Sequence, residues 1–400
     1  MTSSRKGPLQ DLTIIDCTRA LAGPFGAGLL ADLGANVIKI EPPLGDGYRN
    51  IPPFLPDYAS PLSEEVGATD FGAPFASVNR NKRSVCLDLK KDDHKEIFLR
   101  LCDKADAIIE NMRAGVMERL GLGFETISGR NEQIVYACVR GFGDPRTGES
   151  PYAHWPSLDA AAQSFGGLVY ANDGLVTPAI ADIFPGTLAA LGLVSAIHES
   201  KTSGKGQFLD VSMYDAMLAF QKSAVAQYSF TGKPNPSGLQ KAMTLYPFDL
   251  FPAKDGQVSI AVGQPHHWDL LCAAMERGDM INDDRSATNT ARLKNVEWVE
   301  KQICAWTSQL TRAEIMAKLD GSLPAGPVQN MSDIFQDEHV AARGMLDKCN
   351  LGGDNPDISL AASPIKFSRS KTTLYQSPPT LGEHNKEVFA EFGIDLPDDF

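Results

Sequence analysis

Several common signatures are missing from this 400-residue sequence, and each absence excludes a class of function. The seven cysteines are scattered without a CxxC pair or a histidine at ligand spacing, so we expect reduced cysteines and no metal site. Acidic residues outnumber basic ones, and the formal net charge of −13 argues against nucleic acid as a partner. No uninterrupted apolar run reaches the roughly 18 residues of a membrane span, and the start, MTSSRKGPLQDL, lacks a secretion signal, so we expect a cytoplasmic protein without membrane contact.

A dinucleotide fingerprint is also missing, although its context is present. Residues 12–41 read as a strand, a turn, a helix and a second strand that ends at Glu41. The turn, CTRALAGPFGAG (17–28), lacks the GxGxxG spacing that lets backbone amides approach a pyrophosphate. The sequence therefore disfavours a nicotinamide or flavin cofactor.

The pattern of strands and helices is nevertheless regular. Strands are expected at 84–89, 106–111, 133–143 and 208–212, with amphipathic helices between them, and a long apolar helix is expected from Gly186 to about Ser200. This alternation predicts an α/β fold whose mainly parallel sheet is covered by helices on both faces.

Punctuation along the chain predicts its domains. The Pro/Gly-rich segment 232–240 reads as a linker, and LPAGPVQN (323–330) marks a second boundary. We therefore expect a large domain over 1–225 and a smaller α+β domain over 226–330. The remainder, 331–400, is too thin in apolar periodicity to fold alone, so we expect it to return to the large domain.

Basic residues gather in two places. The turn NRNKRS (79–84) contains Arg80, Lys82 and Arg83, which form either a solvated turn or a clamp for a phosphorylated ligand. A second group follows the strand at 106–111, where ligands of open α/β sheets bind; it consists of Asn111, Arg113 and Arg119. Two such groups favour a phosphorylated ligand.

Asp182 is the one formally charged residue between Asp173 and Glu199, three residues before Pro185 and four before Gly186. Its carboxylate can cap the helix that follows, or it can act as a nucleophile or base in the positive field of that helix N-terminus. The residues alone leave both interpretations open. His266 and His267 are adjacent and point apart on a helix, so we expect them at a surface rather than at a metal.

Five blocks in succession carry a family resemblance. They are LTIIDCTRALAGPFGAGLLADLGANVIKIEPPLGD, NRNKRSVCLDLK, ADAIIENMRAGVMERLGLGFE, IADIFPGTLAALGLVSAIHESKTSGKGQFLDVSMYDAML and SPPTLGEHNKEV. In this order they resemble the class III coenzyme A transferases, the family of formyl-CoA transferase and carnitine CoA-transferase. The resemblance implies a Rossmann-like large domain built from both chain ends, a smaller domain, and an interlocked homodimer.

The resemblance also implies a chemistry. The family's nucleophilic aspartate matches Asp182, which would pass coenzyme A from an acyl-CoA, such as succinyl-CoA or another dicarboxylyl-CoA, to an acid through an aspartyl anhydride and an aspartyl-CoA thioester. The positions that match family contacts to CoA are Ala20, Leu21, the stretch Leu87 to Lys90, Asn111, Met112, Arg113, Arg119 and the stretch Trp155 to Leu158.

The chain departs from the family at three places. Pro42 stands where formyl-CoA transferases carry an arginine, so we expect different contacts to the adenine side of CoA. Segment 239–257 lacks their polyglycine loop, which argues against formyl-CoA and oxalate. The α-methylacyl-CoA racemase branch has a histidine before its aspartate, where this chain has Leu158 before Asp159. We therefore favour CoA transfer; an acyl-CoA racemase or isomerase using Asp182 and Asp159, and a non-catalytic acyl-CoA binding protein, are the alternatives.

Overall fold

The chain folds into two compact units. The computed structural model describes residues 7–54, 72–234, 236–237, 244–351 and 357–395. One unit takes residues 1–235 and 341–400, and the other takes residues 236–340. The sequence places these divisions slightly earlier, after 225 and after 330. The predicted linker at 232–240, and the start of the segment 239–257, lie partly outside the described residues.

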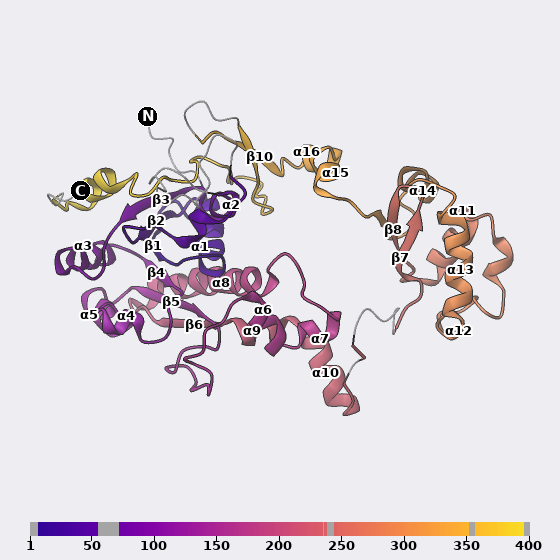
Figure 1. Cartoon of the computed structure of the whole chain (residues 1–400), viewed down its shortest axis with the longest axis horizontal. Helices are drawn as coiled ribbons and strands as arrows, with labels where there is room; N and C mark the ends of the chain where they lie inside the picture. Colours follow the sequence, from indigo (N-terminus) through magenta and orange to yellow (C-terminus); the bar gives the residue numbers. More distant parts are fainter. Residues whose placement is uncertain (1–6, 55–71, 235, 238–243, 352–356, 396–400) are drawn as a thin grey trace. The chain divides into compact units, whose positions relative to one another are not determined.

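A six-stranded parallel sheet forms the centre of the larger unit (Figure 1). Its strands lie in the order β3-β2-β1-β4-β5-β6, the order of a doubly wound nucleotide-binding fold. They are β1 (Thr13–Cys17), β2 (Asn36–Glu41), β3 (Lys82–Cys86), β4 (Ala107–Glu110), β5 (Val135–Arg140) and β6 (Phe208–Ser212). The predicted α/β fold with a parallel sheet is confirmed.

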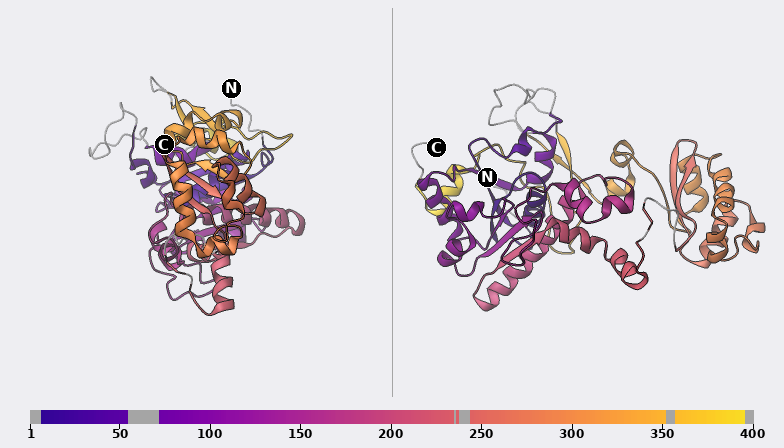
Figure 2. Two further views of the ribbon diagram at one scale, coloured as in Figure 1. Left: turned by 90° about the vertical axis from the view of Figure 1, so that its right-hand side faces the viewer. Right: turned by 60° about the horizontal axis from the view of Figure 1, so that its bottom comes forward.

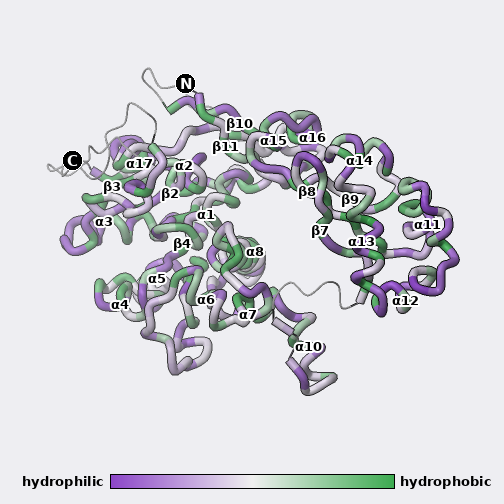
Figure 3. The backbone as a smooth tube through the Cα atoms, turned by 45° about the vertical axis from the view of Figure 1, so that its right-hand side comes forward, coloured by the Kyte–Doolittle hydropathy of each residue, from purple (hydrophilic) through white to green (hydrophobic). Residues whose placement is uncertain are grey.

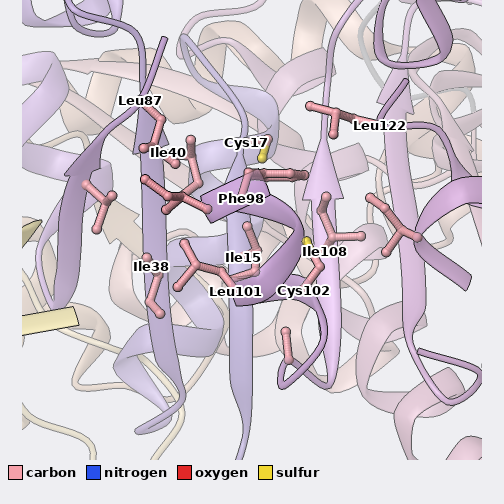
Figure 4. Close-up of a cluster of buried hydrophobic side chains, with 14 of the residues drawn as sticks. Ile15, Cys17, Ile38, Ile40, Leu87, Phe98, Leu101, Cys102, Ile108 and Leu122 are labelled. Carbon is pink, nitrogen blue, oxygen red and sulfur yellow. The ribbon is translucent and has the colours of Figure 1, made fainter. Parts of the chain in front are cut away.

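One face of this sheet carries an apolar row in register, from Ile38 through Ile15 and Ile108 to Tyr136. Figure 4 shows Phe98 of helix α3 lying over these strands. The helices that contribute to this core are α3 (Asp92–Cys102), α4 (Val116–Arg119), α5 (Phe124–Arg130) and α17 (Asn385–Phe392). Helix α17 comes from the end of the chain and lies beside α3 (Figures 1 and 2), where the Lys104 ammonium donates to the Phe392 carbonyl at 2.8 Å.

Two long helices cover the opposite face, α1 (Ala22–Asp32) and α8 (Ile180–Ser203). Their contact is close, because a Cβ added at Gly26 would lie 2.5 Å from the Gly186 carbonyl oxygen. Helix α8 is long and apolar enough to cross a membrane, with a mean hydropathy of 1.8 over 18 residues (Figure 3). Its buried residues lie in the core beneath the sheet, so α8 is a core helix of this unit.

The start of α8 differs from the prediction. The helix begins at Ile180 rather than at Gly186, and Pro185 lies inside it. Proline removes one intrahelical bond, which usually marks a helix end. Here the packing of Ala181, Pro185 and Gly186, all of them buried, outweighs that loss. Asp182 therefore lies within the first turn of a helix, and no strand precedes it in the described segment 166–181.

The smaller unit is an antiparallel sheet with helices on one face (Figures 1 and 2). Its strands are β7 (Phe248–Ala253), β8 (Gly256–Ala261) and β9 (Ala325–Pro327), and its helices are α11 (Pro265–Ala274), η2 (Gly278–Ile281), α12 (Asn289–Lys294), α13 (Val296–Thr307), α14 (Arg312–Leu319) and α15 (Met331–Phe335). The chain passes back to the larger unit within α16 (Glu338–Ala342). The exposed His266 and the partly buried His267 open α11 at its surface.

The remaining elements belong to the larger unit. They are η1 (Gly47–Asn50), α2 (Ala73–Asn79), α6 (Asp159–Phe165), α7 (Leu168–Asn172), α9 (Met213–Phe220), α10 (Lys222–Thr231), β10 (Leu346–Cys349) and β11 (Ile358–Ala361).

Candidate active site

The strand order reverses between β1 and β4, and the loops after these two strands are joined there. The Arg19 amide donates to the Asn111 side-chain oxygen at 2.8 Å, and the Asn111 amide group donates back to the Arg19 carbonyl at 2.8 Å. Ligands of doubly wound sheets bind at this switch point, outside the carboxyl ends of the strands. Asn111 therefore fixes the two loops that flank the expected ligand position.

The loop after β1 is held in a strained conformation. Ala20 has a φ of 62°, in the left-handed region that a residue with a Cβ rarely adopts. Its amide donates to the Asp46 carboxylate at 3.1 Å, and that carboxylate pairs with the fully buried Lys39 at 3.1 Å. Lys39 also donates to the Thr18 carbonyl at 2.9 Å. This buried ion pair explains how the backbone of Ala20 and Leu21 keeps its shape, and the sequence did not reveal it.

A cavity of about 300 Å³ opens at this edge of the sheet. Its walls are mostly apolar, and the predicted CoA contacts that belong to them are the stretch Leu87 to Lys90, Met112 and Arg119. The full lining is Cys17, Arg19, Ile40, Glu41, Pro42, Leu87, Asp88, Leu89, Lys90, Met112, Val116, Arg119 and Leu120. An apolar cleft with a few polar groups at its rim is the usual form of a small-ligand site.

Three cations lie at the rim of this cavity. Arg19, Lys90 and Arg119 are exposed, and none of them forms a salt bridge with another described residue. Exposed cations beside an apolar cleft suit a ligand with both a flat apolar part and phosphate groups, because phosphate oxygens accept charge-assisted hydrogen bonds. Arg19 was not among the residues predicted to contact the ligand, although it stands directly before Ala20.

The basic turn at 79–84 is not a phosphate clamp, contrary to one interpretation of the sequence. It runs into the start of β3, which begins at Lys82, and therefore lies at the amino edge of the sheet. Arg80, Lys82 and Arg83 are all buried. Their ion-pair partners are Asp32 for Arg80, Asp16 for Lys82, and Glu387 with Glu391 for Arg83. Because carboxylates of the protein itself neutralise these three cations, the turn has a structural role.

The backbone of Met112 is fixed by a buried ion pair. The Met112 amide donates to the Glu110 carboxylate at 2.6 Å, and the Arg140 guanidinium donates to the Met112 carbonyl at 3.2 Å. Arg140 and Glu110 pair with each other at 2.5 Å. Sequence reasoning missed both residues, although a charged residue ending each of two buried strands was a visible signal.

Asp182 occupies the first turn of α8 and is partly buried. Burial, together with the negative charge of Asp159, raises the pKa of its carboxyl group to about 7. No described residue donates a hydrogen bond to this carboxylate or forms an ion pair with it. The pKa of Tyr48 in η1 is raised mainly by burial and further by the negative charge of Asp182, so Tyr48 is an electrostatic neighbour of Asp182.

The packing of α8 against α1 brings Asp182 to the same edge of the sheet as the cavity. A Cβ added at Gly186 would lie 2.3 Å from the Ala22 carbonyl oxygen, at the start of α1 and directly after the loop that contains Ala20 and Leu21. Asp182 lies one turn before Gly186. It is therefore an unpaired carboxylate near the positive end of a helix dipole, which is a suitable position for a nucleophile.

The other predicted contacts lie outside the lining of this cavity; they are Ala20, Leu21, Asn111, Arg113 and the stretch Trp155 to Leu158. Arg113 is exposed on the loop after β4. Trp155 is 55% exposed and packs against Tyr152 with ring centroids 4.9 Å apart, and Leu158 is 74% exposed at the start of α6. Among the described residues, no group of three or more His, Cys, Asp or Glu side chains could hold a metal ion.

The fold is thus a doubly wound sheet with an apolar cavity at its switch point, exposed cations at the rim of that cavity and an unpaired carboxylate at the same edge. The model of CoA-transferase family III matches residues 9–385. The chain is 40% identical over 394 residues to a succinyl-CoA:mesaconate CoA-transferase from Haloarcula hispanica, covering 97% of each chain. It is 31% identical over 404 residues to a succinate–glutarate CoA-transferase from Agrobacterium fabrum, covering 97% of this chain and 96% of that one.

A solved structure of a CAIB/BAIF family protein also matches the chain. The crystal structure of a CAIB/BAIF family protein from Brucella suis matches with a TM-score of 0.84 and 31% identity, covering 97% of this chain and all of that one. The chain belongs to CoA-transferase family III. It is thus a class III CoA-transferase, an enzyme that acts on an acyl-CoA and a carboxylic acid.

Proposed function

We propose that this enzyme moves coenzyme A from a dicarboxylyl-CoA, such as succinyl-CoA, to a second carboxylic acid, with Asp182 as the nucleophile. The observation that carries the proposal is the unpaired Asp182 carboxylate in the first turn of α8, at the edge of the sheet where the cavity opens. The dicarboxylate class is supported by relatives named for succinyl-CoA with mesaconate and with glutarate.

The reaction divides into four exchanges at carbonyl carbons. The Asp182 carboxylate attacks the donor thioester, the carbon–sulfur bond breaks, and CoA thiolate leaves behind an acyl-aspartyl anhydride. The thiolate then attacks the aspartyl carbonyl and releases the donor acid, which gives an aspartyl-CoA thioester. The acceptor carboxylate displaces CoA to form a second anhydride, and the thiolate attacks the acceptor acyl group, which regenerates Asp182.

Burial suits Asp182 to this chemistry. A carboxylate stripped of water is a stronger base and nucleophile than one in solution, and the same burial raises its pKa to about 7. The N-terminus of α8 opposes this shift and stabilises the ionised form that attacks. The balance leaves a reactive carboxylate that is ionised at slightly alkaline pH.

We further propose that coenzyme A is held by the predicted residues of the larger unit. Leu87, Met112 and the backbone of Ala20, Leu21 and Asn111 would contact its apolar and pantetheine parts, while Lys90, Arg113 and Arg119 would hold phosphates. Arg19 joins this set because it lines the same cavity. Trp155 and Leu158 remain proposed contacts, supported by the large exposed area that each presents.

We propose that the active form is an interlocked homodimer and that the enzyme is located in the cytoplasm. The dimer is supported by α10, which has no buried residue in the described chain, and by the apolar side chains that α9 and α10 expose. These are Leu218, Phe220, Val225, Tyr228 and Phe230. Contiguous exposed apolar residues of this kind mark a surface that a partner covers.

A transfer assay tests the proposed function. The enzyme is incubated with succinyl-CoA and, in separate reactions, mesaconate, glutarate, oxalate or no acid, and CoA esters are separated by chromatography. We expect a new CoA ester with mesaconate or glutarate, none with oxalate or without an acid, and none from Asp182→Asn. A racemase would instead exchange the α-proton of a branched acyl-CoA in D₂O without any acceptor. That exchange, with no transfer to any acid, would overturn the proposal.

A further inference from the structure

Two polar side chains of α6 bind the segment that leads into the nucleophile's helix. The Ala181 amide donates to one oxygen of the Asp159 carboxylate at 2.9 Å. The side-chain amide of Gln163 donates to the other oxygen at 2.7 Å. Asp159 therefore has both carboxylate oxygens engaged, one of them directly on the residue before Asp182.

Gln163 extends this contact to the incoming chain. Its amide group also donates to the Val176 carbonyl at 2.9 Å, and its side-chain oxygen accepts from the Val176 amide at 2.9 Å. Gln163 is fully buried, and Ala162 beside it packs in one small apolar core with Ala181. Residues 176–181 are thus held at both ends by one turn of α6.

Helix α8 has no side-chain cap of its own at its N-terminus. The residue before the helix, Ala179, has no side chain that could cap the free amides of the first turn. Asp159 caps one of them from a different helix, a role that the sequence had offered to Asp182. With that role filled, the Asp182 carboxylate is left without a structural partner among the described residues.

We propose that Asp159 and Gln163 are positioning residues that fix the first turn of α8 and aim the Asp182 carboxylate at the thioester. This inference rests on the proposed function of Asp182. It also assigns Asp159 a role different from that of a second base, because both of its oxygens already accept hydrogen bonds. Asp159 supplies in addition a fixed negative charge next to the nucleophile.

The experiment compares four variants in the transfer assay, with kcat, KM for the acyl-CoA and the pH profile of kcat/KM as readouts. Asp159→Asn keeps an acceptor for Ala181 but turns an NH₂ group toward the NH₂ group of Gln163. Gln163→Glu places two carboxylates together. The double variant Asp159→Asn/Gln163→Glu reverses the polarity of the hydrogen bond between residues 159 and 163 and, like Gln163→Glu, lacks the donor to the Val176 carbonyl. Asp173→Asn is the matched control, because it removes an exposed carboxylate at a left-handed position that asparagine also tolerates.

We expect Asp159→Asn to lower kcat by about 10- to 100-fold with KM within about twofold, because misplacing a reacting group by about 1 Å costs up to about 100-fold. The apparent pKa should fall by about half a unit or more, because a like charge beside Asp182 is removed. The double variant should recover part of kcat and keep the raised pKa, and Asp173→Asn should match the wild type.

Several results would overturn the inference. The inference is wrong if Asp159→Asn has the wild-type kcat and pH profile, or if Asp159→Asn changes KM alone. It is also wrong if the kcat of the double variant is no higher than that of the worse single variant. If Asp159→Asn does not fold, judged by circular dichroism, Gln163→Glu and the double variant decide the question by the same criteria. A wild-type enzyme without transfer activity would instead refute the proposed function, so the two failures are distinguishable.

Discussion

At the scale of single residues, the site depends on which carboxylates are paired. Asp16, Asp32, Asp46 and Glu41 are buried, and each is bonded to a lysine or arginine. Removing one member of such a pair strongly lowers the stability of the fold, because the remaining charge would be buried alone. Among the described residues, Asp182 has neither such a cation nor a hydrogen-bond donor at its carboxylate, which leaves it available for chemistry.

The pH dependence of the reaction follows from Asp182. Its carboxyl group must be ionised to attack, and its pKa in the free enzyme is about 7. We therefore expect kcat/KM for the acyl-CoA to rise with pH and to level off above about 7, since this parameter reports groups of the free enzyme. A profile that is flat between pH 5.5 and 8, measured under single-turnover conditions, would contradict this assignment.

The same shift affects stability. The raised pKa means that the native state holds the proton where the unfolded chain has lost it, so stability falls as pH rises from about 4 to 7. Asp182→Asn removes this cost and should increase the free energy of unfolding at pH 8 by about 1–3 kcal/mol. The gain should shrink at pH 5 and vanish below about pH 4, as measured by urea denaturation at each pH. An equal effect at all three would count against a titrating Asp182.

At the scale of secondary structure elements, the crossing of α1 and α8 sets the position of the nucleophile. Gly26 and Gly186 let the two backbones approach to a distance that no larger residue permits. The N-terminal ends of both helices then lie at the carboxyl edge of the sheet. Moving one helix outward would displace Asp182 relative to the loop that contains Ala20.

We expect Gly26→Ala to disturb this crossing, because the new methyl group would lie 2.5 Å from the Gly186 carbonyl oxygen. Overpacking of this kind costs about 1–3 kcal/mol, and we expect kcat to fall by about tenfold or more as Asp182 moves. Gly129→Ala in α5 is the control, because nothing lies within 4 Å of its added Cβ. Thermal unfolding and the transfer assay measure both variants; equal behaviour would refute the role of the crossing.

Much of the secondary structure could be predicted from the sequence, because strands and their succession along the chain follow local patterns. The six strands and the loops after β1 and β4 were expected, and so was a ligand site at their edge. The role of Arg80, Lys82 and Arg83 could not be predicted, because their partners Asp32, Asp16 and Glu387 lie 48 to 304 residues away in the chain. The start of α8 was misplaced because Pro185 breaks a local rule that tertiary packing overrides.

At the scale of the whole molecule, the larger unit is built from both ends of the chain. Residues 341–400 contribute α17 to the same apolar core as α3 and β1, although they follow the smaller unit in the sequence. The larger unit also exposes an apolar stretch on α9 and α10 that its own core does not use. Both features are consistent with the interlocked homodimer that the family resemblance implies.

An interlocked dimer should not exchange subunits without unfolding. We expect light scattering to give twice the mass of one chain, and tagged and untagged dimers mixed under native conditions to show no hybrid after a day. Hybrids should form when the same mixture is denatured and refolded, which is the control for tag interference. A monomer mass, or hybrids within minutes of native mixing, would contradict this arrangement.

The most direct test of the account is to identify the residue that carries the covalent intermediate. The enzyme is incubated with succinyl-CoA without an acceptor, quenched with hydroxylamine, digested and analysed by tandem mass spectrometry. We predict a hydroxamate at Asp182 that is absent from Asp182→Asn and from enzyme without the acyl-CoA. A hydroxamate on another residue, or an active enzyme that forms none at Asp182, would contradict the assignment of Asp182 as the nucleophile.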